Sequence, residues 1–232
     1  LIANKYLKDK DEYQAYQENL GFSKELNILR NDYYYQMMDS DGISLIDFLY
    51  NPLDVMSGDA YSARKIDEHS TFYLMVDGMG KGISASLTAM IITSYINYIF
   101  DKMIASNSFD LDCIIDDAMK FIKPILLEEE ALALDFIVID NQNNQLKYAK
   151  FAMPVLLMLN LDDEIIRLKS NNPPLSKYQP NFHTSSVDIT DITKFLIYTD
   201  GIVENETICD GIPYSGFIED DFKSSFTRQE LK

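Results

Sequence analysis

Two apolar segments of this chain end in the same pair of residues, and this repeated ending limits the fold more than any other feature. Residues 72–76 run into Asp77-Gly78, and residues 195–199 run into Asp200-Gly201. A continuous apolar run of this length is typical of a β-strand covered on both faces. Each run therefore predicts a carboxylate at the edge of a sheet, followed by a glycine that lets the backbone turn sharply.

A third aspartate, Asp59, follows Ser57-Gly58 within a predicted strand over residues 55–65. A glycine beside a polar residue inside a strand predicts a bulge that aims Asp59 at a site. A lone Asp-Gly after a strand is more often a hairpin turn. That interpretation fails for Asp77, because a glycine-rich segment and a predicted helix follow it. Three strand-borne carboxylates without histidine partners favour a hard divalent cation, Mg²⁺ or Mn²⁺.

The glycine-rich segment over residues 78–82 invites comparison with loops that bind nucleotide phosphates. It matches neither GxxxxGK[ST] nor GxGxxG, because the glycines are wrongly spaced. What remains is a helix N-terminus beside a carboxylate, where Lys81 could face an anion such as a phosphate. His69 and His183 lie in no motif with a nucleophile or with metal-ligand spacing, so both are interpreted as surface histidines.

Residues 1–41 are predicted to form an N-terminal helical segment that serves as a linker or regulatory element. Gly21 suits a helix end, and Ser23 suits the N-cap of a second helix that reaches to about residue 38. Apolar residues recur along this second helix at three- and four-residue steps and form one stripe. The stripe could pack on the following domain or on a second copy of itself, which would make the chain a homodimer.

Residues 42–232 are predicted to form a single α+β domain. Two adjacent helices, over residues 83–103 and 111–127, stand between two groups of strands rather than alternating with them. Pro124 is expected to end or kink the second helix. This order favours layered antiparallel sheets with helices outside. The predicted strands cover residues 43–50, 55–65, 71–76, 133–140, 145–151, 154–159, 165–169 and 193–199.

Composition narrows the classes of function. The 232 residues carry 37 acidic and 20 basic side chains, for a net charge of −17, which disfavours nucleic acid and anionic membranes as partners. Two unrelated cysteines and the lack of an apolar run of membrane-spanning length predict a cytoplasmic protein with free thiols. The first residue is Leu1 rather than methionine, so we expect the chain to be a piece of a longer protein.

Three motifs occur in the order found in PPM-type metal-dependent phosphatases, and the chain most resembles their bacterial SpoIIE/RsbU branch. They are Ser57-Gly58-Asp59-Ala60-Tyr61, residues 76–82 around Asp77, and residues 198–205 around Asp200. The resemblance implies a four-layer α/β/β/α sandwich of two antiparallel sheets flanked by helices. It also implies hydrolysis of phosphoserine or phosphothreonine on a partner protein by a metal-activated water, under the control of an N-terminal sensor.

The same resemblance implies a centre of two Mn²⁺ or Mg²⁺ ions. Asp77 would bridge the ions, the Gly78 carbonyl would bind one of them, and Asp200 would bind the other. Asp59 would act directly or through a metal-held water. Lys81 is the remaining candidate for contact with the phosphate.

Two departures from the family pattern keep a second hypothesis open. The family's usual Asn-Ala-Gly-His segment is replaced by residues 150–154, Lys-Phe-Ala-Met-Pro. The closing strand, which carries Asp-Asp followed by Thr or Ser, does not occur before Lys232, and Asp220-Asp221 lies in a helical context. The site is therefore expected to be one ligand short. The alternative is a weak or inactive pseudophosphatase that acts as a protein-binding signalling module.

Overall fold

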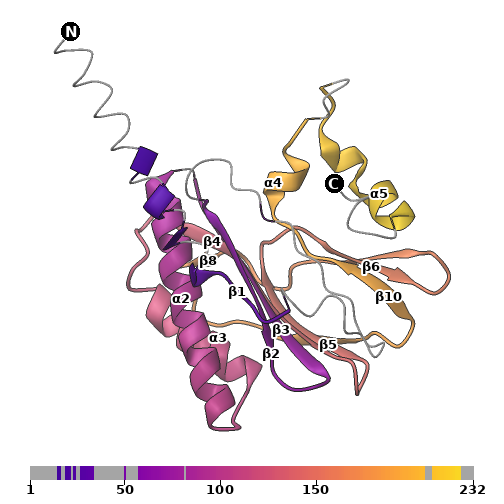
Figure 1. Ribbon diagram of the computed structural model, residues 1–232, viewed down its shortest axis with the longest axis horizontal. Helices are drawn as coiled ribbons and strands as arrows, with labels where there is room; N and C mark the ends of the chain where they lie inside the picture. The colour runs from indigo at the N-terminus through magenta and orange to yellow at the C-terminus, as the bar shows by residue number, and fades with distance from the viewer. Residues whose placement is uncertain are drawn as a thin grey trace.

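The structure, a computed structural model, describes residues 15–16, 19–21, 23–24, 27–33, 50, 57–80, 82–206 and 211–225. Two β-sheets and two long helices account for most of these residues (Figure 1). The elements, in chain order, are β1 (Arg30–Asn31), β2 (Asp59–Lys65), β3 (Ser70–Gly78), α2 (Ile83–Ala105), α3 (Leu111–Ile122), β4 (Ala131–Asp140), β5 (Gln145–Phe151), β6 (Leu156–Asn160), β7 (Ile165–Leu168), β8 (Leu175–Ser176), β9 (Ser185–Asp188), β10 (Ile192–Leu196), α4 (Asp200–Val203), the 3₁₀ helix η1 (Tyr214–Gly216) and α5 (Ile218–Ser224).

The larger sheet has seven strands in the order β1-β2-β3-β4-β5-β9, with β8 paired to part of β4. The smaller sheet has three strands in the order β10-β6-β7. Every pairing is antiparallel except that of β1 with β2, which is parallel. The predicted mixed fold of two sheets with helices is confirmed, and the antiparallel prediction fails only at β1.

The side chains of β3 and β4 alternate between two hydrophobic clusters, as the period of a strand requires. Phe72, Leu74 and Leu134 join the cluster that packs under α2 and α3, with Ile92, Ile96, Ile114 and Ile115. Ile137 and Ile139 of β4 instead join a cluster with Leu156 and Met158 of β6 in the smaller sheet. Both faces of the large sheet are thus covered, which explains why its central strands are apolar at nearly every position.

A third cluster lies on the other face of the smaller sheet. Leu157 and Leu159 of β6 alternate away from the large sheet and pack with Ile218 and Phe222 of α5. Lys194 of β10 also donates to the carbonyls of Phe222 and Ser225 at the end of that helix. The short C-terminal helices therefore cover the smaller sheet (Figure 1).

Most predicted elements lie where the sequence placed them. The helix expected over residues 83–103 is α2, and the helix expected to stop near Pro124 is α3, which ends at Ile122. Asp110 begins α3 as its N-cap by accepting a hydrogen bond of 2.8 Å from the amide of Cys113. The turn at residues 141–144 joins β4 to β5 as a hairpin.

One face of α2 is exposed although it carries apolar residues. Leu87, Ile91 and Tyr98 are exposed, whereas the buried face carries Ala85, Ala89, Ile92, Thr93, Ile96 and Asn97. Apolar residues occur all round this helix, so periodicity alone could not choose the face. By length and composition α2 could also cross a membrane, but half of that window is buried here against the sheet and α3, as in the core helix of a globular domain.

Four further predictions about secondary structure need correction. The helix expected to continue to about residue 38 gives way at Arg30–Asn31 to β1, because this segment pairs with β2 instead. Gly58 precedes β2 rather than forming a bulge within it. The last long strand ends at Leu196 and is half-buried rather than buried. The sequence also gave no signal for β8 and β9, which are short and contain serine. The strand expected over residues 43–50 lies outside the described residues except for its last residue.

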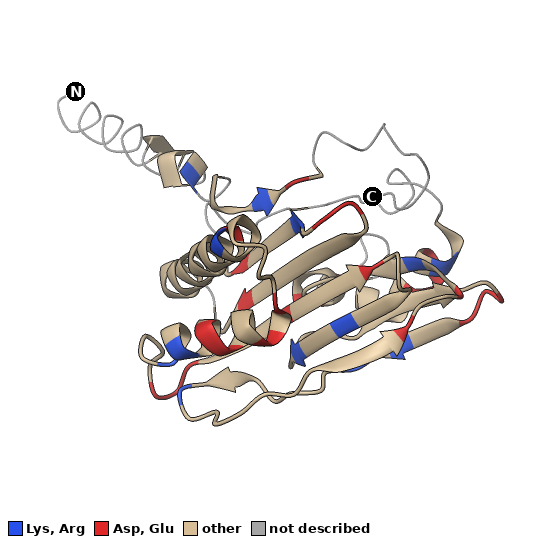
Figure 2. Cartoon of the chain, turned by 90° about the horizontal axis from the view of Figure 1, so that it is seen from below, with Lys and Arg blue, Asp and Glu red and all other residues tan. Residues whose placement is uncertain are grey.

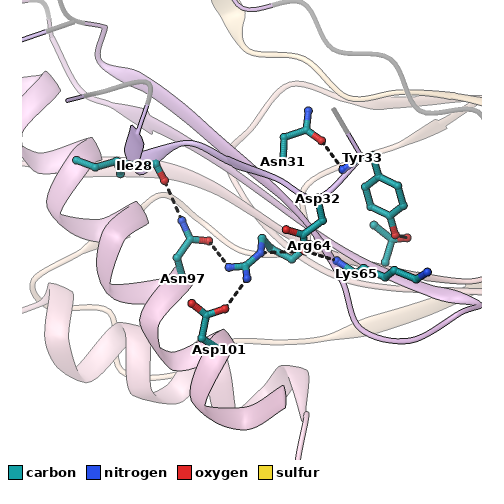
Figure 3. A network of polar contacts seen from close by, with 9 residues as sticks. Ile28, Asn31, Asp32, Tyr33, Arg64, Lys65, Asn97 and Asp101 are labelled. Atoms are coloured by element: carbon teal, nitrogen blue, oxygen red, sulfur yellow. Dashed lines mark hydrogen bonds and ion pairs between the residues drawn. The ribbon is translucent and has the colours of Figure 1, made fainter. Parts of the chain in front are cut away.

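Arg64 of β2 ties the segment before β1, the strand β2 and the helix α2 together (Figure 3). Its buried guanidinium donates to Asp32 at 3.2 Å, to Asn97 at 3.2 Å and to Asp101, and it stacks over the ring of Phe100. Asn97 in turn donates to the carbonyl of Ile28 at 3.2 Å. A planar group with five donors suits this arrangement, which a lysine could not reproduce.

Replacing Arg64 with methionine should lower the free energy of unfolding by about 2 kcal/mol, because it leaves the buried Asn97 amide without its donor and removes two ion pairs. Urea denaturation measures the change. Lys120→Met is the matched control, since the Lys120 ammonium pairs with Asp116 on the exposed face of α3. This substitution should lower the free energy of unfolding by less than about 0.5 kcal/mol. Equal effects of the two substitutions would contradict the role assigned to Arg64.

A buried ion pair joins β4 to β5 between the two sheets. Asp135 and Lys150 face each other in the antiparallel register, both side chains are about 1% exposed, and the Lys150 ammonium donates to Asp135 Oδ2. Asp135 Oδ1 has no partner among the described residues. Burial raises the pKa of Asp135 to about 6 and lowers the pKa of Lys150, so desolvation opposes the charge on each partner.

Lys150→Met should therefore destabilise the protein by about 3 kcal/mol, because Asp135 is left buried without its cation. The double substitution Asp135→Leu with Lys150→Met should recover most of that loss, since an apolar pair needs no compensation. Urea unfolding of the two variants measures both effects. A double variant no more stable than Lys150→Met alone would contradict the prediction that the buried Asp135 carboxylate causes the loss.

Candidate metal centre

Asp59 and Asp77 lie directly opposite each other because β2 and β3 pair in an antiparallel register that joins these two residues. On β3, Phe72, Leu74 and Val76 face the helices, so Asp77 alternates to the face that the smaller sheet covers. Asp200 is the first residue of α4, four residues beyond the end of β10. The Asp77 carboxyl lies within hydrogen-bonding reach of both Asp59 and Asp200. The three aspartates predicted from the sequence therefore converge.

The pKa values of Asp59 and Asp77 are both raised by burial, and the charges of neighbouring aspartates contribute to each shift. Burial, and after it the charges of Asp59 and Asp200, raise the pKa of Asp77 to about 7. Burial also raises the pKa of Asp59, although the hydrogen bond from Thr199 opposes this shift. Like charges this close favour one protonated carboxyl unless a cation neutralises them. The donor set, made of the half-buried carboxylates of Asp59 and Asp77 and the exposed carboxylate of Asp200, fits a divalent metal that prefers oxygen ligands.

The side chains are not yet arranged as a finished ligand set. Among the residues that the structure describes, no group of three or more His, Cys, Asp or Glu side chains has the geometry to hold an ion. The three aspartates lie close to one another, but their side chains do not have the geometry of ligands around one ion.

Two glycines let the backbone approach closely beside Asp77. The amide of Gly78 donates to the carbonyl of Gly58 at 3.0 Å, and a Cβ at Gly78 would lie 2.9 Å from the carbonyl oxygen of Ala85. Gly82, the N-cap of α2, has a φ of 88°, which an L side chain rarely adopts. A larger residue at either position would move the start of α2 relative to the carboxylates.

Other residues named from the sequence stand in different places. Lys81 lies outside the described residues. The backbone of His183 forms hydrogen bonds with the side chain of Asn172. Cys113 is an exposed thiol on α3. Acidic residues elsewhere are spread over helices and loops, with basic residues between them (Figure 2). The overall negative charge therefore does not mark the site.

Sequence reasoning missed two hydroxyl residues that contact Asp59. Thr199 donates to Asp59 Oδ2 at 2.8 Å, and Ser57 Oγ accepts from the Asp59 amide at 3.0 Å. Both belong to the motifs already recognised, Thr199 immediately before Asp200 and Ser57 two residues before Asp59. Their position beside a ligand candidate was the available signal, but the contact of Thr199 depends on how the sheets meet.

The segment that departs from the family pattern contains a strained residue. Ala152 has a φ of 56°, which lies in the left-handed region that favours glycine. Lys150 of the same segment is the buried partner of Asp135 described above.

Two facing sheets with helices, and three converging aspartates at one edge, define a PP2C-type domain. The SiaA-PP2C domain of Pseudomonas aeruginosa has the same fold, with a TM-score of 0.71 over 92% of this chain and 83% of that chain at 19% identity. A structure of RsbX in complex with magnesium has a TM-score of 0.54 over 84% of this chain and 80% of that chain, at 18% identity.

The chain belongs to the SpoIIE family, because residues 67–220 match the family model described as Stage II sporulation protein E (SpoIIE). This range includes Asp77 and Asp200, and Asp59 lies just before it. The phosphoserine phosphatase RsbP of Bacillus subtilis (strain 168) is 26% identical over 168 residues. That alignment covers 71% of this chain but 41% of RsbP, so the chain spans about two fifths of the length of this relative.

Asp77→Asn should stabilise the metal-free protein at about pH 8, because it removes one of three mutually repelling carboxylates. The pKa of Asp77 is raised from 3.8 to about 7 on folding, so the folded state binds this proton more tightly. The contribution of Asp77 to the free energy of unfolding is therefore present below pH 3.8 and lost as the pH rises through about 7.

Thermal unfolding in a chelating buffer across this pH range tests the prediction. The loss of stability that Asp77 causes as the pH rises should be absent from the Asp77→Asn variant. Asp117→Asn, the same chemical change on the exposed face of α3, is the control and should reproduce the parent profile. An Asp77→Asn variant that is less stable than the parent at alkaline pH would show that the carboxylates do not repel one another.

Proposed function

We propose that this chain is the catalytic domain of a metal-dependent protein phosphatase that hydrolyses phosphoserine or phosphothreonine on a signalling partner protein. The observation that carries the proposal is the convergence of Asp59, Asp77 and Asp200, with the pKa of Asp77 raised to about 7. Carboxylates crowded in this way are stable as anions only beside cations. Membership of the SpoIIE family and the similarity to phosphoserine phosphatase RsbP support the assignment.

In this proposal two Mn²⁺ or Mg²⁺ ions would be held by Asp77, which would serve as a ligand of both, by Asp200 and the Gly78 carbonyl, which would each serve one, and by Asp59, which would act directly or through a water. Bound ions of this kind lower the pKa of a coordinated water and offset the charge of phosphoryl oxygens. The protein's own contribution is to hold the oxygen ligands on rigid strand ends.

The wider setting is also a proposal. Residues 42–232 would form the phosphatase domain, completed as a four-layer α/β/β/α sandwich. Residues 1–41 would join it to a sensor and could pair two copies of the chain. We place this protein in the cytoplasm, where a phosphorylated signalling protein would be its substrate. The packing of α2 and α3 on one sheet and of α5 on the other supports the layered arrangement.

The purified chain should hydrolyse p-nitrophenyl phosphate and a phosphoserine peptide only with millimolar Mn²⁺ or Mg²⁺. Asp77→Asn should lower kcat/KM on the order of a thousandfold, since bound cations supply several kcal/mol of transition-state stabilisation. Asp117→Asn is the control of equal charge change and should keep full activity. Metal-independent hydrolysis, or an active Asp77→Asn variant, would refute the proposed chemistry.

A pseudophosphatase is the second candidate, and one observation favours it. The three aspartates converge without forming a finished ligand set among the described residues. A protein of this kind would keep the fold and signal through contacts with a partner. Calorimetric titration with Mn²⁺ separates the two functions, because the absence of binding at millimolar metal supports the pseudophosphatase and binding with turnover supports the enzyme.

A further inference from the structure

The hydroxyl of Thr199 joins two parts of the site that are 140 residues apart in the sequence. It donates a hydrogen bond of 2.8 Å to Oδ2 of Asp59. Asp59 opens β2 in the large sheet, whereas Thr199 follows β10 of the smaller sheet. The bond therefore fixes one oxygen of a candidate ligand from the opposite side of the acidic edge, which is the sheet edge where Asp59, Asp77 and Asp200 lie.

Local structure does not account for this side chain. Thr199 is the N-cap of α4, with an extended backbone at φ −93° and ψ 168°. At such a position the hydroxyl usually accepts a hydrogen bond from the backbone N–H two or three residues later. No such cap bond forms in α4, and the hydroxyl is directed to Asp59 instead. A contact favoured within the helix is thus given up for a contact with the site.

The remainder of Asp59 is also held in place. Its amide donates to Ser57 Oγ at 3.0 Å, and its backbone is fixed opposite Asp77 by the strand register. Gly201 lies beside the bond, since a Cβ there would be in ordinary van der Waals contact, at 3.6 Å, with both Asp59 Oδ2 and Thr199 Oγ1. With its backbone and one oxygen fixed, the Asp59 carboxylate retains little rotational freedom.

We propose that Thr199 is a positioning residue of the metal centre, whose hydroxyl holds Asp59 in the orientation from which that carboxylate binds a divalent cation. This inference rests on the proposed function, because it assumes that the acidic edge binds metal. It assigns to Thr199 an effect on metal affinity through Asp59, with no contact of its own to metal or phosphate. Threonine suits this role because its branched Cβ restricts χ1 and so holds the hydroxyl in one direction.

The test compares Thr199→Val, which keeps the shape but removes the donor, with Thr199→Ser, which keeps the donor. Calorimetric titration of the metal-stripped chain with MnCl₂ measures the affinity. Thr199→Val should weaken Mn²⁺ binding by about 10- to 100-fold, the usual effect of removing a group that orients a metal ligand. Thr199→Ser should stay within about threefold of the parent, because the hydrogen bond can still form.

A purely structural role would appear in a different measurement. If Thr199 only tied the sheets together, Thr199→Val would lower the metal-free unfolding temperature and leave the affinity of the folded protein unchanged, and that result would overturn the proposal. Should Thr199→Val fail to fold at all, Thr199→Ala, which introduces no buried methyl group in place of the hydroxyl, takes its place in the same titration.

A double-mutant cycle shows whether the effect passes through Asp59. In an Asp59→Ala background the acceptor is absent, so Thr199→Val should cause no additional loss of Mn²⁺ affinity. An equal loss in both backgrounds would overturn the proposal. A parent protein that binds no Mn²⁺ refutes the proposed metal centre together with this inference. A parent protein that binds Mn²⁺ while Thr199→Val matches it refutes the inference alone.

Discussion

The antiparallel register between β2 and β3 is the constraint on which the site depends. It places Asp59 opposite Asp77 at the end of two strands whose other residues are anchored in the core under α2 and α3. Burial at this position, together with the nearby charges of Asp59 and Asp200, raises the pKa of Asp77 to about 7. The stability of the core thus holds in place an arrangement that is unfavourable without a cation, as is common where function opposes stability.

The two sheets contribute unequally to this arrangement. The large sheet carries Asp59 and Asp77 on central strands, while Asp200 and Thr199 enter from the segment that follows the edge strand β10. The packing of β6 against the large sheet, through Leu156 and Met158, brings these two groups together. A change in how the two sheets pack would therefore alter the distance between Asp200 and Asp77 even if each sheet kept its own structure. The buried pair of Asp135 and Lys150 lies in the same interface.

Several elements were predictable because their signals are local. The run before Asp77 and the turn at residues 141–144 depend on neighbours within a few residues. Other elements were not predictable, because tertiary contacts overrode local preference. Arg30–Asn31 became a strand by pairing with β2, and packing alone chose the buried face of α2, since apolar residues surround that helix. Strands as short as β8 contain too few residues to carry a pattern.

The sequence by itself determined that Asp77 and Asp200 follow apolar runs and precede glycines, because such runs and turn residues are read from neighbouring positions, whereas it placed Asp59 inside a strand rather than at its start. It also determined the mixed order of strands and helices. Only the tertiary structure decided that these three side chains meet, that Thr199 bonds to Asp59 across 140 residues, and that Lys150 is buried against Asp135. Such contacts depend on strand register and on the packing of two sheets, which are set by the whole core rather than by any local segment.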